Sequence, residues 1–422
     1  MLRIIGHVDS CNESFIEGWI TIPDASEPKI SLEFVLDEEV IGRCVADLFR
    51  QDLKDAGLGD CAFHFPTPPL LPKGDLSRIM VRVENSSVVL PIDSAKRTQP
   101  APTRSETFSR FGGLWIDRYD WMDQLALKHR KGEISDDLSD AICHFVRDGY
   151  VVIKGAVPPD VVDRVNQDID RVWVSPPPGL VVETFEPDSI LRAIPPHVSV
   201  RAGRTKMLDL YTCSTAAREA IAAPRVIEFL SVIFEDQPKA FQGLGFWNGS
   251  QQAIHKDSAY VKIDSNPMHM AATWLALEDI QPGTGELEYY IGSHRAPEFL
   301  FGGSYKWMES HPEEHDRFLQ SLHDDAKSLG HLKGSFLGKK GDVLVWHADL
   351  AHGGSQITQP SLTRKSLVTH FTPVANEPYY RRDTSYREAE QGGIRFVSAF
   401  ADVGGAPIKL EPQAEKVSER CA

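Results

Sequence analysis

The sequence predicts a mostly β protein with flanking helices, arranged as two domains. Its 422 residues exceed the usual size of one hydrophobic core, and a hydrophobic content of 41% is enough to build two. Short runs rich in Val, Ile and Phe, separated by Asp, Asn, Pro and Gly, fill residues 1–91 and recur from about residue 241 to 374. Such runs are typical of β-strands.

The first predicted domain spans residues 1–91 and is expected to be a small β-sandwich. Its apolar runs are short and are bounded by turn residues, as in sandwich domains. The predicted strands cover residues 2–8, 18–22, 30–36, 41–45, 79–83 and 88–90.

A polar tract follows and predicts a linker over residues 92–109, with Ser, Lys, Arg, Thr, Gln and Pro in place of apolar residues. The second domain is then expected over residues 110–422. It opens with a helix in which Leu138, Ile142 and Phe145 recur at helical spacing, and Gly149 ends that helix before a strand at 150–153. A second helix starts at Pro159, and a charged helical insert is expected over residues 312–329.

Charge and composition narrow the range of partners. A net charge of −15 disfavours nucleic acid and anionic membranes as main partners, and favours small molecules or neutral polymers. The start of the chain lacks the apolar core of a signal peptide, and no apolar run is long enough to span a membrane. Six scattered cysteines without paired spacing are typical of a reducing compartment. We therefore expect a soluble, cytoplasmic protein; its oligomeric state is not indicated.

His255 and Asp257 are the first candidates for a metal site. Iron(II) enzymes that activate dioxygen need two imidazoles and one carboxylate on one face of the metal. On a strand, residues two apart point to the same side, so both side chains could bind one ion while Lys256 faces away.

The same His-x-Asp spacing occurs twice more, so spacing alone identifies no site. His323 lies in the charged helical insert, where a solvated face is the simpler interpretation. His347 lies on a strand that runs into a glycine turn after His352, and spacing leaves the choice between these two histidines open.

Several motifs in order resemble the phytanoyl-CoA dioxygenase family of iron(II), 2-oxoglutarate oxygenases. They are FVRDGYVVI at 145–153, ATWLALED at 272–279, GSH at 292–294 and LAHG at 350–353. The resemblance covers over half the chain and implies a double-stranded β-helix, or jelly roll, with the ligands at the mouth of the barrel. It selects His352 over His347 as the third ligand beside His255 and Asp257.

The resemblance also implies a site for 2-oxoglutarate. Arg364 follows where the family places an arginine for the distal carboxylate, which an arginine can bind with two parallel hydrogen bonds. A short turn between adjacent strands would bring it near His352, twelve positions earlier. Ser355 matches a hydroxyl partner, although the extra Gly354 shifts its register. Further candidates are Lys206 and Trp274, which match co-substrate positions, and Gln252, a polar side chain three residues before His255.

The implied activity is hydroxylation, with iron(II), 2-oxoglutarate and dioxygen consumed to give succinate and carbon dioxide. Related halogenases carry a small residue at the position of Asp257, so this carboxylate favours hydroxylation or another oxidation over halogenation.

Residues 46–57 (ADLFRQDLKDAG) resemble small β-domains attached to bacterial glycosyltransferases and other polysaccharide enzymes, which suggests a sugar, glycan or glycoconjugate substrate. An acyl-CoA or other small metabolite, and a metal-free jelly roll used only for binding, are the alternatives. The cluster of Asp47, Arg50 and Asp52 is expected to be an ion-pair and capping network.

Overall fold

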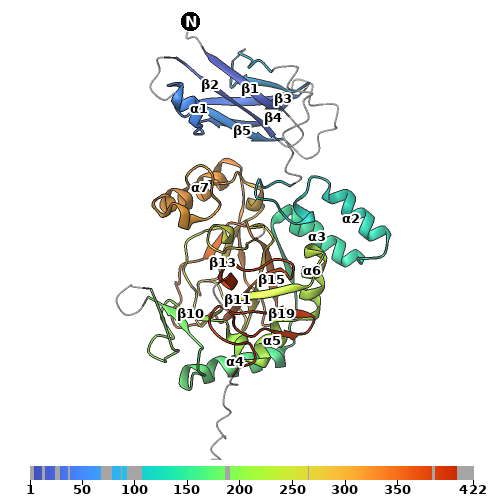
Figure 1. The fold of residues 1–422 in the computed structure, drawn as a ribbon, viewed down its shortest axis with the longest axis vertical. Coiled ribbons are helices and arrows are strands. Elements are labelled where there is room, and N and C mark those ends of the chain that lie inside the picture. Colours follow the sequence, from blue (N-terminus) through green and yellow to red (C-terminus); the bar gives the residue numbers. More distant parts are fainter. Residues whose placement is uncertain are drawn as a thin grey trace, which may run out of the picture. The chain divides into compact units, whose positions relative to one another are not determined.

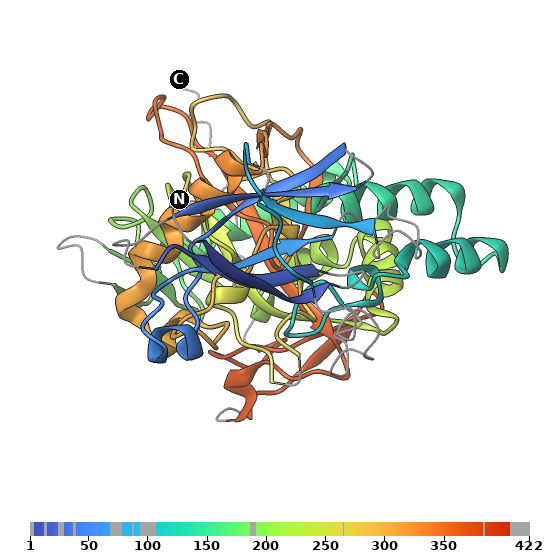
Figure 2. The same cartoon turned by 90° about the horizontal axis from the view of Figure 1, so that it is seen from above.

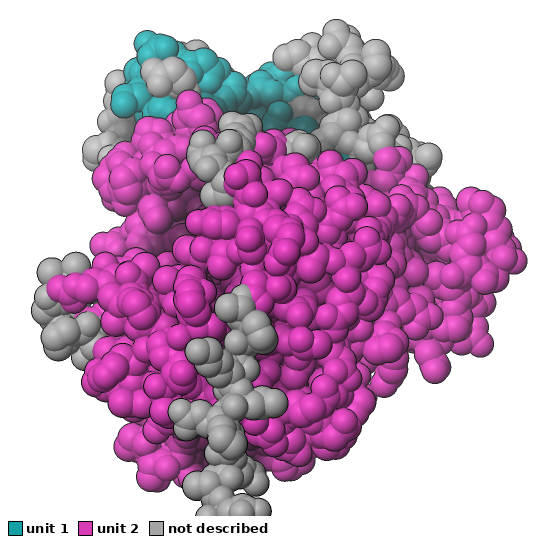
Figure 3. All heavy atoms as spheres, turned by 60° about the horizontal axis from the view of Figure 1, so that its bottom comes forward, with its two compact units in different colours: residues 1–108 teal, residues 109–422 magenta. Residues whose placement is uncertain are grey.

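The computed structural model describes residues 4–11, 15–23, 29–36, 39–67, 78–86, 88–92, 107–185, 191–264, 266–382 and 385–405. Its chain divides into two compact units, residues 1–108 and 109–422 (Figure 3). The polar tract at 93–106, which carries most of the predicted linker, lies outside the described residues.

Unit 1 is a sandwich of two antiparallel three-stranded sheets, in the orders β1-β2-β5 and β4-β3-β6. Apolar side chains from both sheets, among them Ile16, Phe34 and Phe63, form one shared core. Its elements are β1 (Ile5–Cys11), β2 (Phe15–Thr21), β3 (Ile30–Leu36), β4 (Glu39–Ala46), α1 (Gln51–Asp55), β5 (Ala62–Pro66) and β6 (Met80–Val83).

Three details of unit 1 differ from the sequence prediction. Strand β5 was missed, although Phe63 and Phe65 alternate with His64 and pack into the core. The strand predicted at 88–90 is wrong, because Val89 forms only an isolated bridge with Arg82. Helix α1 was also missed; its five residues are too few to show helical periodicity.

Helices and short 3-10 turns open unit 2 and flank its sheets (Figures 1 and 2). The N-cap Ser135 accepts a hydrogen bond from the Leu138 amide, and Gly149, at φ +82°, ends α3 as predicted. The helices are α2 (Trp121–Arg130), α3 (Asp136–Asp148), α4 (Pro159–Val174), α5 (Thr215–Ile221), α6 (Pro224–Phe234) and α7 (His315–Ser328), with 3-10 turns η2 (Trp115–Asp117), η3 (Leu210–Thr212), η4 (Asp257–Ala259), η5 (Ser293–Arg295), η6 (Met308–Ser310), η7 (Pro312–Glu314) and η8 (Tyr379–Arg382).

The strands of unit 2 form a large sheet and a small one. The large sheet runs β7-β15-β12-β17-β11-β10-β8-β9, with β19 beside β11 and β18 beside β19, and the small sheet runs β14-β13-β16. The strands are β7 (Tyr150–Ile153), β8 (Val182–Thr184), β9 (Arg192–Ile194), β10 (Thr205–Leu208), β11 (Pro238–Phe246), β12 (Ala271–Ala276), β13 (Leu287–Tyr290), β14 (Lys333–Phe336), β15 (Val343–His347), β16 (His352–Gly354), β17 (Ser366–Pro373), β18 (Ala389–Gln391) and β19 (Ile394–Phe396).

Strand alternation divides the interior of unit 2 into two cores. Along β15, Val343 and Val345 pack with the helices, whereas Leu344 and Trp346 pack against the small sheet. Neighbouring strands β12 and β17 divide in the same way, since Leu275 and Leu367 join the helix-side core. The space between the two sheets is therefore the filled interior of a jelly roll, which confirms the predicted fold class. Among the described residues, no helix has the length and apolar character needed to cross a bilayer.

The helix-side core predicts a clear contrast between two leucine substitutions. Leu367 on β17 is 1% exposed, whereas Leu332 is 73% exposed. Leu367→Ala should lower the free energy of unfolding by about 2–5 kcal/mol, because it opens a cavity between sheet and helices. Leu332→Ala should change it by less than about 0.5 kcal/mol. Urea unfolding followed by tryptophan fluorescence measures both, and equal effects would contradict this assignment of the core.

Candidate metal centre

Backbone pairing brings two histidines from distant parts of the chain together. His255 and His352 form an isolated antiparallel bridge, in which each amide donates to the other residue's carbonyl, at 2.8 and 2.9 Å. The glycines after His352 make this approach possible. A Cβ on Gly353 would lie 2.7 Å from the Gln252 carbonyl oxygen, and one on Gly354 would lie 2.7 Å from Ser250 Oγ. Gly354, the extra glycine that shifts the register of Ser355, therefore leaves room for the segment that carries Ser250.

Asp257 completes a cluster of three buried side chains with these histidines. Its Oδ1 lies 3.6 Å from His255 Nε2 and 3.7 Å from His352 Nε2, and all three ligand atoms lie within 4.8 Å of one another. The three residues are 5–7% exposed. One metal ion could bind all three atoms.

The remaining nitrogen of each histidine has its own hydrogen bond. Nδ1 of His255 lies 2.8 Å from the Ala253 carbonyl oxygen, and Nδ1 of His352 lies 2.9 Å from that of Leu350. A carbonyl only accepts, so both Nδ1 atoms carry the proton and both Nε2 lone pairs are free for a metal. Burial lowers the pKa of His352 to about 4, which keeps this imidazole neutral near pH 7.

Asp257 is held from its other side by two residues that the sequence analysis did not select. The Trp346 indole donates to Asp257 Oδ2 at 2.8 Å, and His370 Nε2 lies 3.2 Å from the same oxygen. Burial would raise the pKa of Asp257, but the nearby His352 and His370 outweigh it and hold that pKa well below its usual value. The carboxylate is therefore ionised, as a metal ligand must be.

The two rival histidines lie elsewhere. His347 follows Trp346 on β15, so its side chain points to the helix side of the sheet, where Nε2 lies 3.0 Å from Asp117 Oδ1. His323 lies on α7, and its Nδ1 contacts the Tyr290 hydroxyl at 2.9 Å. Neither belongs to the three-residue cluster.

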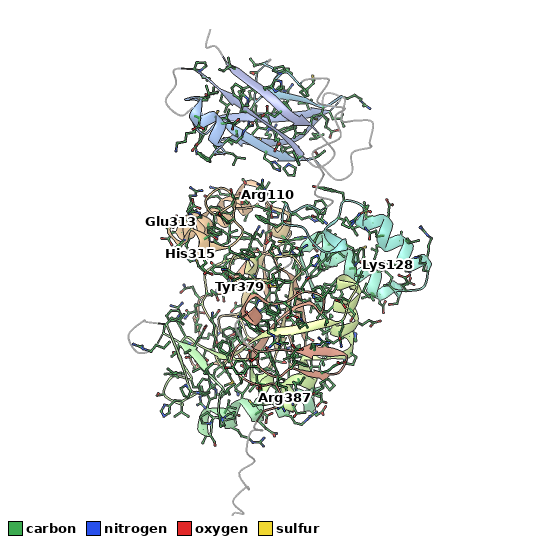
Figure 4. The ribbon with its side chains drawn as sticks, in the orientation of Figure 1. Arg110, Lys128, Glu313, His315, Tyr379 and Arg387 are labelled. Carbon is green, nitrogen blue, oxygen red and sulfur yellow. The ribbon has the colours of Figure 1, made fainter. Side chains whose placement is uncertain are left out.

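Helix α7 covers the segments that carry the two histidines. Phe318 and Leu322 of α7 pack with Ile254 and Ala351, which directly precede His255 and His352. His315 lies at the start of α7 (Figure 4), and its Nε2 is 2.7 Å from the Tyr260 hydroxyl. The insert thus excludes water from one side of the cluster.

Arg364 is buried and forms no ion pair with the residues that the structure describes. It is 3% exposed, its Nη1 donates to Ser366 Oγ at 3.0 Å, and its Nη2 donates to the Asn248 carbonyl at 3.3 Å. Its Nε has no hydrogen-bond partner, and no carboxylate of the described residues lies within 4.0 Å of the guanidinium. Burial lowers the pKa of Arg364 to about 10, so it is still charged at neutral pH. A buried cation in this state is suited to an anionic ligand.

The other predicted co-substrate residues have different neighbours in unit 2, and only some of them contact Arg364 or the histidine ligands. The guanidinium of Arg364 lies 5.2 Å from the centre of the Trp274 ring. Gln252 Nε2 lies 3.2 Å from His255 Nε2. Ser355 donates its amide to the Glu286 carbonyl, and the hydroxyl on Arg364 comes from Ser366 instead. Lys206 lies on β10 opposite Glu183. The roles of Trp274, Ser355, Lys206 and Gln252 stay predictions.

Two local expectations are corrected. His255 and Asp257 do not share a strand, since His255 forms an isolated bridge and Asp257 begins the turn η4. The strands on either side of Arg364, β16 and β17, belong to different sheets, so no simple hairpin joins them.

The donor set fits iron(II). Two neutral imidazoles and one carboxylate on one face, with further positions open, are the ligands of non-haem iron oxygenases. Arg364, which is buried, contacts Ser366 at the start of β17, and His370 of the same strand lies near Asp257. This arrangement fits a dicarboxylate co-substrate bound to the same metal.

Solved structures with similar folds include several iron enzymes. EctD from S. alaskensis with bound Fe is 20% identical, with a TM-score of 0.43, and the match covers 58% of this chain and 79% of that chain. The epimerase SnoN, in complex with Fe³⁺, alpha ketoglutarate and nogalamycin RO, is 14% identical, with a TM-score of 0.45 and coverage of 63% and 98%. AviO1 from Streptomyces viridochromogenes is 16% identical, with a TM-score of 0.39 and coverage of 58% and 99%.

These identities are low, and the classification rests on the sequence itself. The phytanoyl-CoA dioxygenase (PhyH) family model matches residues 145–366, from the end of α3 to the start of β17. This match spans more than half of the chain and contains His255, Asp257, His352 and Arg364. The chain therefore belongs to the phytanoyl-CoA dioxygenase family, and is a dioxygenase of the class that uses iron and 2-oxoglutarate.

Proposed function

We propose that this chain hydroxylates a sugar, glycan or glycoconjugate, with iron held by His255, Asp257 and His352 and with 2-oxoglutarate held at Arg364. The observation that carries the co-substrate assignment is the buried guanidinium without a carboxylate partner. Such a charge is costly unless a ligand neutralises it. The distal carboxylate of 2-oxoglutarate has the charge and planar shape that a guanidinium binds best.

Bound iron would supply the activation of dioxygen that is coupled to the conversion of 2-oxoglutarate into succinate and carbon dioxide. The protein's own residues position the reactants. Arg364 and Ser366 would fix the distal end of the co-substrate, and Trp274 would close the pocket beside it. The α7 insert and the buried interior keep water from the cluster.

The substrate class is supported by unit 1. This unit has its own core, and its segment 46–57 carries the resemblance to polysaccharide enzymes. Within that segment Leu48 and Phe49 are 45% and 49% exposed, which leaves apolar surface for a partner or a chain of sugar rings. Arg50 pairs with Asp52 and with Asp9, as expected of an ion-pair network, whereas Asp47 lies 3.5 Å from Lys29 instead. Trp19 is only partly buried, and packs against Leu53 and Cys61.

A cytoplasmic location belongs to the same proposal. Cys44, Cys61, Cys143 and Cys213 are free thiols, the state that a reducing compartment maintains.

The ligand assignment predicts which histidine substitutions abolish metal binding. Anaerobic wild-type protein should bind about one iron(II) per chain, and His255→Ala or His352→Ala should reduce binding and 2-oxoglutarate turnover to background, because each removes one of three ligands. His347→Gln is the matched control, since this histidine lies on the other face of β15. Loss of iron in His347→Gln with retention in His352→Ala would transfer the ligand role to the rival.

The co-substrate assignment predicts a selective effect of Arg364. Arg364→Ala should raise KM for 2-oxoglutarate by the equivalent of roughly 2–5 kcal/mol, because a buried carboxylate loses its charged partner. Arg364→Lys should restore only part of this, because the planar fork is lost. Metal affinity, measured separately, should stay near the wild-type value. An unchanged KM would remove Arg364 from the co-substrate site.

The substrate proposal predicts that the two units have separable roles. A chain that begins near Phe108 retains the whole unit 2 core and every proposed ligand, so it should fold and slowly decarboxylate 2-oxoglutarate. Coupled oxidation of a long glycan should weaken on truncation, because unit 1 no longer raises its local concentration. Oxidation of a monosaccharide should change much less. Equal rates of both chains on the long glycan would leave unit 1 without a substrate role.

A further inference from the structure

We propose that Trp346 and His370 are positioning residues that hold Asp257 as a one-oxygen metal ligand. The inference rests on the proposed ligand set and assigns a role to two residues outside it. Both contact the same atom, Asp257 Oδ2, while Oδ1 faces the two histidine ligands. The carboxylate thus has one oxygen toward the metal position and one toward the protein.

Trp346 makes the better defined contact of the two. An indole nitrogen can only donate, so the 2.8 Å contact must be a hydrogen bond from Trp346 to the carboxylate. The ring is 1% exposed and cannot turn away without disturbing the packing between the sheets. It also packs against the ring of His352, with 4.8 Å between centroids. Trp346 therefore fixes a carboxylate and an imidazole of the cluster at once.

His370 is an unusual residue for the interior of a barrel. It is 3% exposed, and neither ring nitrogen makes a hydrogen bond of good geometry in the described structure. The nearest charged atom is Asp257 Oδ2, at 3.2 Å from Nε2. A buried polar group left unsatisfied costs free energy, so its presence needs a compensating role.

The position of His370 on β17 indicates that role. Ser366, Val368 and His370 alternate along the strand and point into the barrel, with Ser366 contacting Arg364 and His370 contacting Asp257. One strand face thus runs from the proposed co-substrate anchor to the metal ligand. His370 lies at the metal end of it.

Holding Oδ2 matters because open metal positions are needed. Two imidazoles and a one-oxygen carboxylate leave three of six positions, two for the keto acid of 2-oxoglutarate and one for dioxygen. A carboxylate that binds through both oxygens would occupy one of these. The Trp346 N–H group and the nearby His370 ring keep that oxygen engaged with the protein, and so favour the open arrangement.

Cobalt(II) titration of the full-length protein without oxygen tests the proposal, because cobalt bound by the same ligands absorbs visible light. Trp346→Phe keeps an aromatic ring and removes the N–H. It should bind cobalt about 10–100-fold more weakly. The visible spectrum should also change shape, because the binding mode of the carboxylate changes, and 2-oxoglutarate should bind the cobalt-loaded variant more weakly.

The matched control is Trp115→Phe. Trp115 is also buried and its indole also donates at 2.8 Å, but to the Val232 carbonyl among the helices. The control should show wild-type cobalt affinity and spectrum. A spectrum altered equally in both variants would mean that any lost indole hydrogen bond perturbs the site, and would overturn a specific role for Trp346.

His370 provides a second, independent variant in case Trp346→Phe does not fold. His370→Phe should weaken cobalt binding and change the spectrum, and His370→Asn, which restores an N–H donor, should recover part of both. Wild-type affinity and spectrum in Trp346→Phe and His370→Phe would overturn the proposal while leaving the ligand set intact. A wild-type protein that binds no cobalt would overturn the ligand set, and the proposal with it.

Discussion

The antiparallel backbone bridge between His255 and His352 is the interaction on which the rest of the site depends. Two reciprocal amide-to-carbonyl hydrogen bonds join a loop after β11 to the start of β16. Because the bridge fixes both backbones, each histidine can form a further hydrogen bond from Nδ1 to a nearby carbonyl and direct Nε2 inward. The adjacent glycines at 353 and 354 are the steric condition for this pairing.

Burial then determines the electrostatics of the site. Low accessibility keeps His352 neutral and leaves Arg364 charged without a counter-ion, while Asp257 stays ionised through its neighbours. A metal ion requires a neutral His352 and an ionised Asp257, and an anionic co-substrate requires a charged Arg364. An anionic ligand at Arg364 and a metal ion at the cluster would offset the cost of burying these charges, as in other preorganised sites.

The sequence predicted the parts of this structure that follow local rules. Helix α3 has a serine N-cap, a periodic apolar face and a C-terminal glycine, and all three signals are local. The cluster of His255, Asp257 and His352 required the resemblance to a family, because spacing alone did not separate His352 from His347. Strand alternation places Trp346 and His347 on opposite faces, but the sequence does not show which face is the barrel interior.

Other features could not be predicted because they arise from tertiary packing. His370 belongs to no short motif, and its approach to Asp257 in η4 joins two segments that are far apart in the sequence. Ser366, Val368 and His370 lie two residues apart, so the sequence indicates that their side chains share one face of a strand. This spacing points to the site only after Arg364 has been assigned to the co-substrate. Strand β5 was missed because its short run follows a helix too short to recognise.

The central claim is that one metal ion binds His255, Asp257 and His352 on a single face. Crystals of the full-length protein grown anaerobically with iron(II) and 2-oxoglutarate, measured at the iron absorption edge, test it most directly. We expect one anomalous peak, bonded to Nε2 of both histidines and to Oδ1 of Asp257, with the distal carboxylate of 2-oxoglutarate on Arg364. A peak beside His347, or 2-oxoglutarate bound away from Arg364, would contradict the account.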